Sequence, residues 1–158
     1  MQVKKAVADI KAAGHDISDE YSIEECLGFL NTAINEVSSL LIAARSPMMA
    51  AEILLHDGES VPERYVSPAG RYPIRMTGRK VQFIDRSLSE IRFRYWQTMP
   101  LLESDAGEMP FPHEALNDYA VKVAVLLALN RNEYDISQDK ALYDELRGLL
   151  AGAVSLDG

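Results

Sequence analysis

The sequence contains little of the cysteine and histidine on which disulfides and zinc sites depend. Among its 158 residues there are one cysteine, Cys26, and three histidines. One thiol can form neither an internal disulfide nor a cysteine-based zinc site. Cys26 directly precedes Leu27 in the first turn of a predicted helix, and no histidine is placed by sequence to activate it. We therefore interpret Cys26 as a buried structural cysteine.

Long apolar runs are also missing. No run approaches the roughly 20 residues that a bilayer-spanning helix needs. The first residues, Met1 to Val7, continue as an amphipathic pattern and do not resemble a signal peptide. We therefore expect a protein made in the cytosol, with no membrane partner. Hydrophobic residues make up 47% of the chain, which is enough for a core, and the length predicts a single domain over 1–158.

Catalytic motifs are absent or incomplete. The pairs His15-Asp16 and His56-Asp57 lie beside glycine turns, whereas a metal-dependent hydrolase would need further ligands placed on helices. We interpret both pairs as surface turns and keep such a hydrolase as an alternative. Gly78-Arg79-Lys80 lacks the earlier glycine and the Ser/Thr of a phosphate-binding loop, so it predicts a hairpin turn. The sequence thus predicts no catalytic residue, no metal and no cofactor.

Positive charge is scarce overall and concentrated in one segment. The net charge is −8, which argues against a general nucleic-acid binder. Between Arg64 and Arg94 lie 8 of the 16 basic residues, against only Asp85 and Glu90. The segment carries about +6 and the rest of the chain about −14, from −8 minus +6. Such opposed parts can complement each other head to tail.

Helical spacing predicts four helices, at about 2–13, 22–45, 113–130 and 136–151. The second begins with the form of a capping box, in which Ser22 is the cap and Glu25 reaches back, and Pro47 should end it by Ser46. The third is apolar on nearly all sides, as is typical of a central helix. Asp135-Ile136-Ser137-Gln138 has the form of a second capping box, and residues 152–158 are expected to fray.

Between the second and third helices the apolar period changes from 3.6 to 2, which predicts a β insertion over about 49–97. Residues 60–73 are rich in proline and glycine and predict an extended arm. Ile91, Phe93 and Tyr95 should face one side of a strand, with Arg92, Arg94 and Trp96 on the other. The predicted fold class is mostly α within α+β. It has a four-helix bundle-like core, with the β insertion and the arm between helices two and three.

Arginine interleaved with aromatic residues is the unusual chemistry of this insertion. Arg, Tyr and Trp dominate the energetics of protein–protein contacts. We therefore predict a protein-contact surface, whose candidate residues are Arg71, Arg75, Arg79, Arg92, Arg94, Tyr95 and Trp96. The alternatives are a solvated polar face and a nucleic-acid contact made through charge, the latter disfavoured by the acidic remainder of the chain.

Three stretches of the sequence resemble the head–tail connector, or adaptor, proteins of tailed bacteriophages. The first is Leu27-Gly28-Phe29-Leu30-Asn31, in the second predicted helix. The second is Ile91 to Trp96 followed by Met99-Pro100-Leu101-Leu102. The third is the acidic loop that ends in Met109-Pro110-Phe111-Pro112, leads into Ala120 to Asn130 and is followed by a final helix containing Tyr143 and Leu146. The resemblance is one of pattern and covers most of the chain.

This resemblance implies a structural virion protein of the phage neck, made in the host cytoplasm. It implies a ring of this chain, expected to hold twelve copies, between the portal protein and the tail or a stopper or tail-terminator protein. Genomic DNA would pass through the lumen without sequence-specific binding. A ring needs two different complementary faces on each subunit, and an acidic lumen would avoid gripping DNA. The alternative outside any virus is a cytosolic, non-enzymatic adaptor or regulatory module that binds a protein partner.

Overall fold

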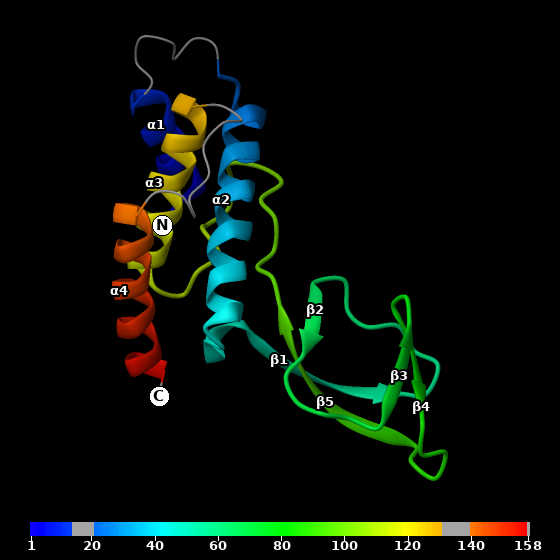
Figure 1. Ribbon diagram of the computed structural model, residues 1–158. Coiled ribbons are helices and arrows are strands. Elements are labelled where there is room, and N and C mark those ends of the chain that lie inside the picture. Colours follow the sequence, from blue (N-terminus) through cyan, green and yellow to red (C-terminus); the bar gives the residue numbers. More distant parts are fainter. Residues whose placement is uncertain (14–20, 131–139, 158) are drawn as a thin grey trace.

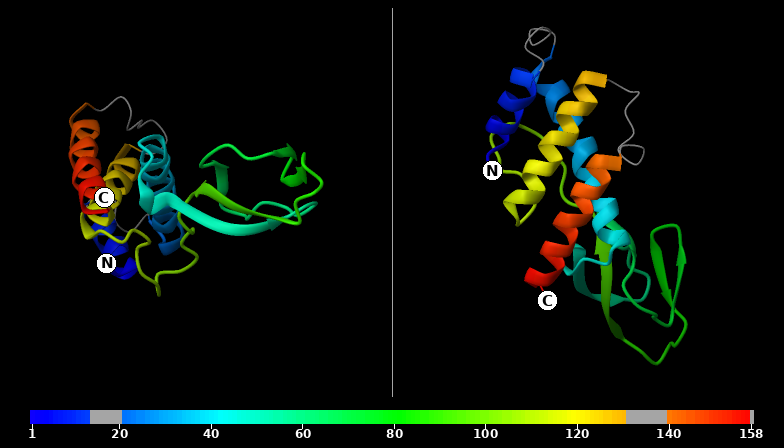
Figure 2. Two further views of the ribbon diagram at one scale, coloured as in Figure 1. Left: turned by 90° about the horizontal axis from the view of Figure 1, so that it is seen from below. Right: turned by 60° about the vertical axis from the view of Figure 1, so that its left-hand side comes forward.

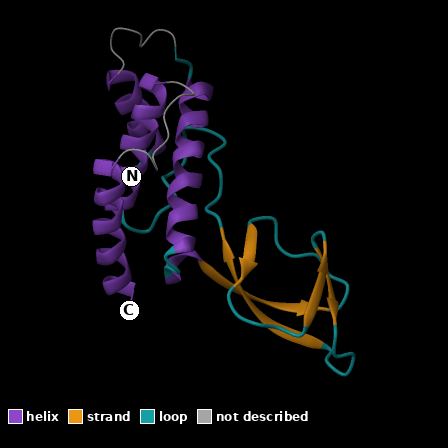
Figure 3. Ribbon diagram, viewed as in Figure 1, coloured by secondary structure: helices purple, strands orange, loops and turns teal. Residues whose placement is uncertain are grey.

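The computed structural model describes residues 1–13, 21–130 and 140–157, in which helices and strands occupy separate regions (Figures 1 and 3). The helices are α1 (Val3–Ala13), α2 (Ile23–Ala43), α3 (Glu114–Asn130) and α4 (Lys140–Asp157), with a short 3₁₀ helix, η2, at Pro47–Met49. The strands are β1 (Ala50–His56), β2 (Tyr65–Pro68), β3 (Ile74–Thr77), β4 (Lys80–Phe83) and β5 (Glu90–Gln97).

The predicted four-helix bundle-like fold is wrong. In the described parts of the chain the fold is α+β, with four α-helices and two antiparallel sheets. The physical reason is that the strands bury apolar side chains against one another and form a hydrophobic core separate from that of the helices. We call residues 50–97 the β unit and the remainder the helical body. The β unit projects from the lower end of α2, away from the helices (Figures 1 and 2).

Helix α3 is the central helix, because it contacts α1, α2 and α4. Its side chains Tyr119, Ala120 and Ala124 are buried against the regularly spaced apolar positions of α2, such as Leu30 and Ile34. By length and composition alone, α2 would be able to cross a membrane, contrary to the expectation from the sequence. Burial of its apolar stripe in the helical core gives a sufficient reason for this composition.

Two further predictions concern the helical body: the burial of Cys26, which is confirmed, and the end of the last helix near Gly152, which is wrong. Cys26 is buried, and this burial raises the pKa of its thiol above the ordinary value. Helix α4 continues to Asp157 and does not end near Gly152 as expected. It is attached to α3 by an ion pair between Lys122 and Glu145, with 2.8 Å between Nζ and Oε1, and by partly buried Leu149. The second predicted capping box and the His15-Asp16 pair lie outside the described residues.

The predicted start of α2 is confirmed. The Ser22 hydroxyl accepts a hydrogen bond from the Glu25 N–H at 3.1 Å, and the Glu25 carboxylate reaches back to the Ser22 N–H. The helix ends before Pro47, as expected, in two capping bonds. The Ser46 N–H donates to the Leu41 carbonyl and the Arg45 N–H donates to the Ile42 carbonyl, at 3.0 and 2.9 Å. This is the Schellman arrangement, which requires a left-handed residue at the position of Arg45.

Arg45 has a φ of 57°, a conformation that normally favours glycine. We expect Arg45→Gly to raise the free energy of unfolding by up to about 1 kcal/mol, because glycine relieves the contact of Cβ with the backbone. Arg45→Ala is the matched control, since it removes the charge and keeps the strain. Urea unfolding followed by circular dichroism measures both variants. A glycine variant no more stable than the alanine variant would contradict this account.

The β unit contains a three-stranded antiparallel sheet of order β1-β5-β2 and the hairpin β3-β4. The chain after β1 links the two, because the Gly58 and Val61 N–H groups both donate to carbonyls of the 79–81 segment at 2.8 Å. The predicted arm at 60–73 is not simply extended. It contains β2, whose Tyr65 ring lies against Phe93, with ring centroids 6.1 Å apart, and against Tyr95.

The alternation expected along β5 is present. Ile91, Phe93 and Tyr95 are buried in the core of the β unit, while Arg92 and Arg94 are exposed on the opposite face of the sheet. The apolar residues Leu55, Val61, Val81 and Phe83 complete this core. The β unit therefore has an inner, apolar face covered by its own hairpin and an outer face formed by β1 and β5.

Candidate protein-contact surface

Arg92 and Arg94 are the two candidate contact residues that the structure brings onto one surface. Both are exposed on the outer face of β5, opposite Leu54 and Glu52 of β1. Arg92 forms an ion pair with Glu52, with 3.4 Å between Nε and Oε1. We call the side chains of Glu52, Leu54, Arg92 and Arg94 the outer patch. Because both partners of the ion pair are exposed, it adds little to stability and leaves the patch open to contact.

Tyr95 and Trp96 lie elsewhere, although the sequence places them beside Arg94. Tyr95 is buried in the β unit, where its ring stacks on Phe93 with centroids 5.8 Å apart. Trp96 is partly buried and packs against the core of the helical body. The Tyr95 side chain therefore serves packing inside the β unit, and that of Trp96 serves the junction between the β unit and the helices.

The remaining candidates, Arg71, Arg75 and Arg79, lie on the connection to β3 and on the β3-β4 hairpin. All three are exposed. The Arg79 guanidinium donates to the carbonyls of Val61 and Pro62, and so holds the β1–β2 connection against the hairpin. Arg79 therefore has a local structural contact, whereas Arg71 and Arg75 have no ion pair within the described residues.

The charge of the β unit is lower than the arginine segment suggested. Its eight basic residues stand beside six acids, for a net +2, because β1 and the following turn add Glu52, Asp57, Glu59 and Glu63 to the two acids counted before. The remainder of the chain is then −10, from −8 minus +2. The β unit is a mixed-charge module on an acidic body, and its arginines are concentrated on β5 and the hairpin side.

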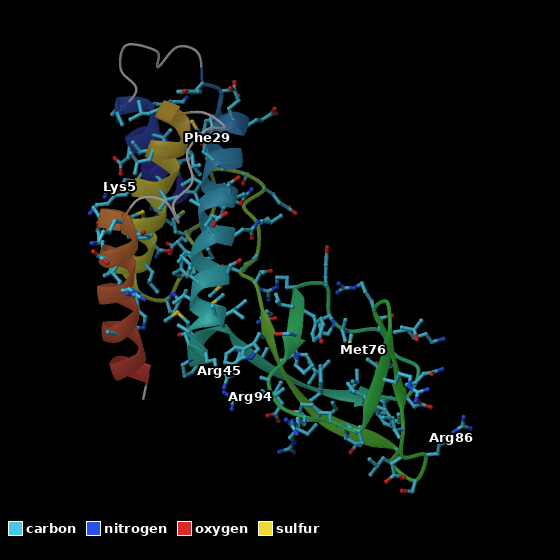
Figure 4. All side chains as sticks on the ribbon, viewed as in Figure 1. Lys5, Phe29, Arg45, Met76, Arg86 and Arg94 are labelled. Atoms are coloured by element: carbon cyan, nitrogen blue, oxygen red, sulfur yellow. The ribbon has the colours of Figure 1, made fainter. Side chains whose placement is uncertain are left out.

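Two kinds of surface residue were missed by the sequence. The first is Arg45, which lies at the end of α2 where the β unit begins (Figure 4). The second is exposed aliphatic residues, above all Leu54, whose side chain is 54% exposed in the outer patch, and Ile84, which is 61% exposed in the β4–β5 loop. Leu54 is the middle residue of the apolar run Ile53-Leu54-Leu55, and a strand of alternating faces must expose one member of such a run.

A groove of about 780 Å³ lies between α2 and the segment that follows β5. Its walls include Asn35 and Ser39 of α2, Arg64, Thr98 and Leu101. Arg64 donates to the Thr98 carbonyl at 3.2 Å across one end of it. The lining is mixed and includes two carboxylates, Glu63 and Glu103, beside the Arg64 guanidinium.

The histidine–aspartate pair that is described, His56-Asp57, is used for turn structure. His56 Nδ1 lies 2.5 Å from the Glu59 carboxylate, and the Asp57 carboxylate accepts from the Phe83 N–H at 2.7 Å. The described parts of the chain contain no group of three or more His, Cys, Asp or Glu residues placed to hold a metal ion. Asp57 thus fixes β4 to the turn after β1.

Comparison of the sequence with protein-family models and with curated proteins finds no match.

Proposed function

We propose that this chain is a non-enzymatic structural subunit of the neck of a tailed bacteriophage, where copies form a ring between the portal and the tail and let DNA pass. The observation that carries the proposal is the projecting β unit with its exposed outer patch. It projects from the helical body, as the left view of Figure 2 shows, and presents arginine and aliphatic side chains on one face of its sheet. Exposed side chains of this kind are typical of contact surfaces. The resemblance of three sequence stretches to connector proteins supplies the specific setting.

The charge distribution supports assembly through unlike faces. A cyclic ring needs two different complementary surfaces on each subunit. The outer patch supplies Arg92 and Arg94, and the helical body carries −10 over the rest of the chain. Contact between the β unit of one copy and the acidic body of the next would be favourable, and opposite charges would also speed its formation.

The acidic body also fits the passage of DNA. Each phosphate neutralised by a basic side chain adds affinity and releases counterions, so a basic lumen would hold DNA in place. Exposed acids at Glu103 and Glu108 lie in the loop before α3. A lumen lined by such side chains would repel the phosphates and let the duplex slide.

The test is assembly of the purified full-length chain on the portal ring encoded by the same genome. Negative-stain electron microscopy should show a second ring stacked on the portal. Arg94→Glu should weaken this assembly by about tenfold or more, since it reverses a charge at the proposed contact. Arg86→Glu is the control, because it makes the same charge change at an exposed arginine of the β4–β5 loop, outside the outer patch (Figure 4). No stacked ring with portal in excess, or equal loss in both variants, would overturn the proposal.

A further inference from the structure

Strand β1 has an open edge. It is an outer strand of the three-stranded sheet, with β5 on one side and no described strand on the other. Its seven residues pair with β5 in unbroken register, and the middle of the strand is Ile53-Leu54-Leu55. Edge strands usually carry proline, lysine or a bulge, or lie beneath another element, because an open edge invites pairing with another chain. Strand β1 has no proline, lysine or bulge.

The backbone groups along this edge point outward. The Arg94 N–H donates to the Tyr72 hydroxyl and the Arg94 carbonyl accepts from the Ala69 N–H, both at 2.9 Å and both on the β2 side. Glu52 lies opposite Arg94, so this is a pair without mutual hydrogen bonds. By the alternation of an antiparallel ladder, the N–H and carbonyl groups of Glu52 and Leu54 then point away from β5.

His56 lies two residues after Leu54, so its backbone N–H and carbonyl point to the same side as those of Glu52 and Leu54. Both groups are already hydrogen-bonded on that side, which confirms that they point away from β5. The His56 N–H donates to the Glu59 carboxylate at 2.7 Å, and the Glu59 N–H donates back to the His56 carbonyl at 3.1 Å. The turn after β1 therefore satisfies the backbone hydrogen-bonding groups at the C-terminal end of this edge. The two residues before it, Glu52 and Leu54, have outward backbone donors with no partner among the described residues.

We propose that β1 pairs antiparallel with β1 of a second copy of this chain, about a two-fold axis at Leu54. In this register each Leu54 faces the Leu54 of the other copy. Glu52 lies opposite the other copy's His56, and Ile53 lies opposite its Leu55. The residues with outward backbone groups are then opposite one another, as the hydrogen-bonded pairs of an antiparallel ladder require.

The side chains of the strand suit this partner. On the outer face, the two Leu54 side chains, each 54% exposed in the single chain, would cover one another. At each end of the ladder Glu52 would lie opposite His56, whose ring nitrogens lie 2.5 Å from the Glu59 carboxylate and 3.6 Å from the Glu90 carboxylate. On the inner face, Ile53 and Leu55 would continue the apolar surface. Every contact occurs twice, which is the self-complementarity that a two-fold interface needs.

The pairing goes beyond the proposed ring and does not depend on it. Neighbours in a cyclic ring of unlike faces are not related by a two-fold axis, so the β1 pair belongs to the free protein. In the pair, the Glu52 carbonyl of one copy would replace the Glu59 carboxylate as the acceptor for the other copy's His56 N–H. Both Glu59 and His56 are exposed, so this exchange requires no change in the core.

Cysteine cross-linking tests the register. Hydrogen-bonded antiparallel partners have Cα atoms about 5.5 Å apart, within disulfide range. Leu54→Cys should therefore form a disulfide with its own copy under mild oxidation, with Cys26 buried and unreactive. Residue 52 lies four positions from its own copy across the ladder, roughly 14 Å away, so Glu52→Cys should not cross-link. Ile84→Cys, on an exposed loop, controls for collisional cross-linking. Cross-linking of Glu52→Cys in place of Leu54→Cys would overturn the proposed register.

Light scattering of the free full-length chain tests the pair itself. The mass should move from monomer to dimer with concentration. Leu54→Lys should raise the dissociation constant at least about tenfold, because it sets like charges opposite each other in place of two leucines. Val66→Lys, at an exposed residue of β2, should leave it unchanged. A wild-type chain that stays monomeric, with no more cross-linking of Leu54→Cys than of Ile84→Cys, would overturn the proposal, whatever the portal experiment shows.

Discussion

Phe93→Ala is expected to lower the free energy of unfolding of the β unit by about 3–5 kcal/mol. Phe93 is fully buried at the centre of this unit. Its ring centroid lies 4.9 Å from that of Tyr72 and 5.8 Å from that of Tyr95. Truncation would leave a cavity among these rings and remove aromatic contacts worth about 0.5–1.5 kcal/mol each. Urea unfolding followed by near-ultraviolet circular dichroism would measure the loss.

Two controls sharpen this prediction. Ile84→Ala removes an aliphatic side chain that is 61% exposed, and it should change stability by less than about 0.5 kcal/mol. Phe93→Leu should keep part of the lost stability, because leucine fills part of the volume. Since the β unit and the helices have separate buried clusters, hydrogen exchange in Phe93→Ala should quicken first in β1 and β5. Equal loss of protection in α2 and α3 would show that the two cores unfold as one.

Asn117→Ala is expected to cost about 2–4 kcal/mol, the second largest effect. Asn117 is fully buried in the first turn of α3. Its side-chain oxygen accepts from the Phe111 N–H at 3.1 Å, and its amide donates to the Phe111 carbonyl at 3.0 Å. Alanine would leave both backbone groups of Phe111 buried and without partners. Such unsatisfied groups cost about 1–3 kcal/mol each, and chemical denaturation would measure the sum.

The control for this variant is Asn35→Ala, at an exposed position of α2, with an expected change under about 0.5 kcal/mol. If Asn117→Ala lowered the free energy of unfolding by less than about 1 kcal/mol, the loop before α3 would be positioned mainly by contacts other than the Asn117 hydrogen bonds. That loop is also tied to Asn31, whose amide donates to the Leu102 carbonyl at 3.0 Å and whose oxygen accepts from the Leu102 N–H at 2.7 Å. Both asparagines attach irregular backbone to a helix through a pair of reciprocal hydrogen bonds.

The elements were largely predictable from the sequence because their signals are local. Ser22 and Glu25 are three residues apart and satisfy each other's backbone groups, so they mark the start of α2 in any fold. The two faces of β5 follow from alternation alone, which placed Phe93 inside and Arg94 outside. Periodicity does not decide between a strand and a helical tail for the stretch Met49 to Leu55 at the start of the β insertion, since a short apolar run without alternation suits a helix equally well.

The candidate surface was predictable only in part. Neighbours in sequence were assigned to one surface, but Arg94 faces solvent, Tyr95 lies in the β core and Trp96 packs on the helices. The basic character of the segment was also overestimated. Strand β1 brings Glu52 beside Arg92 from forty positions away, and counting charge along the chain does not register this pairing.

The sequence determines the start of α2 and the alternating faces of β5, since capping and spacing act over a few residues. It also determines that the chain is poor in cysteine and histidine, because composition does not depend on folding. The tertiary structure decides the rest. It separates the β unit from the helical body, and with it the α+β fold from a helical bundle, because cores form between residues distant in sequence. It likewise leaves the edge of β1 open, since whether a strand lies at the edge or in the middle of a sheet depends on which other strands pair with it.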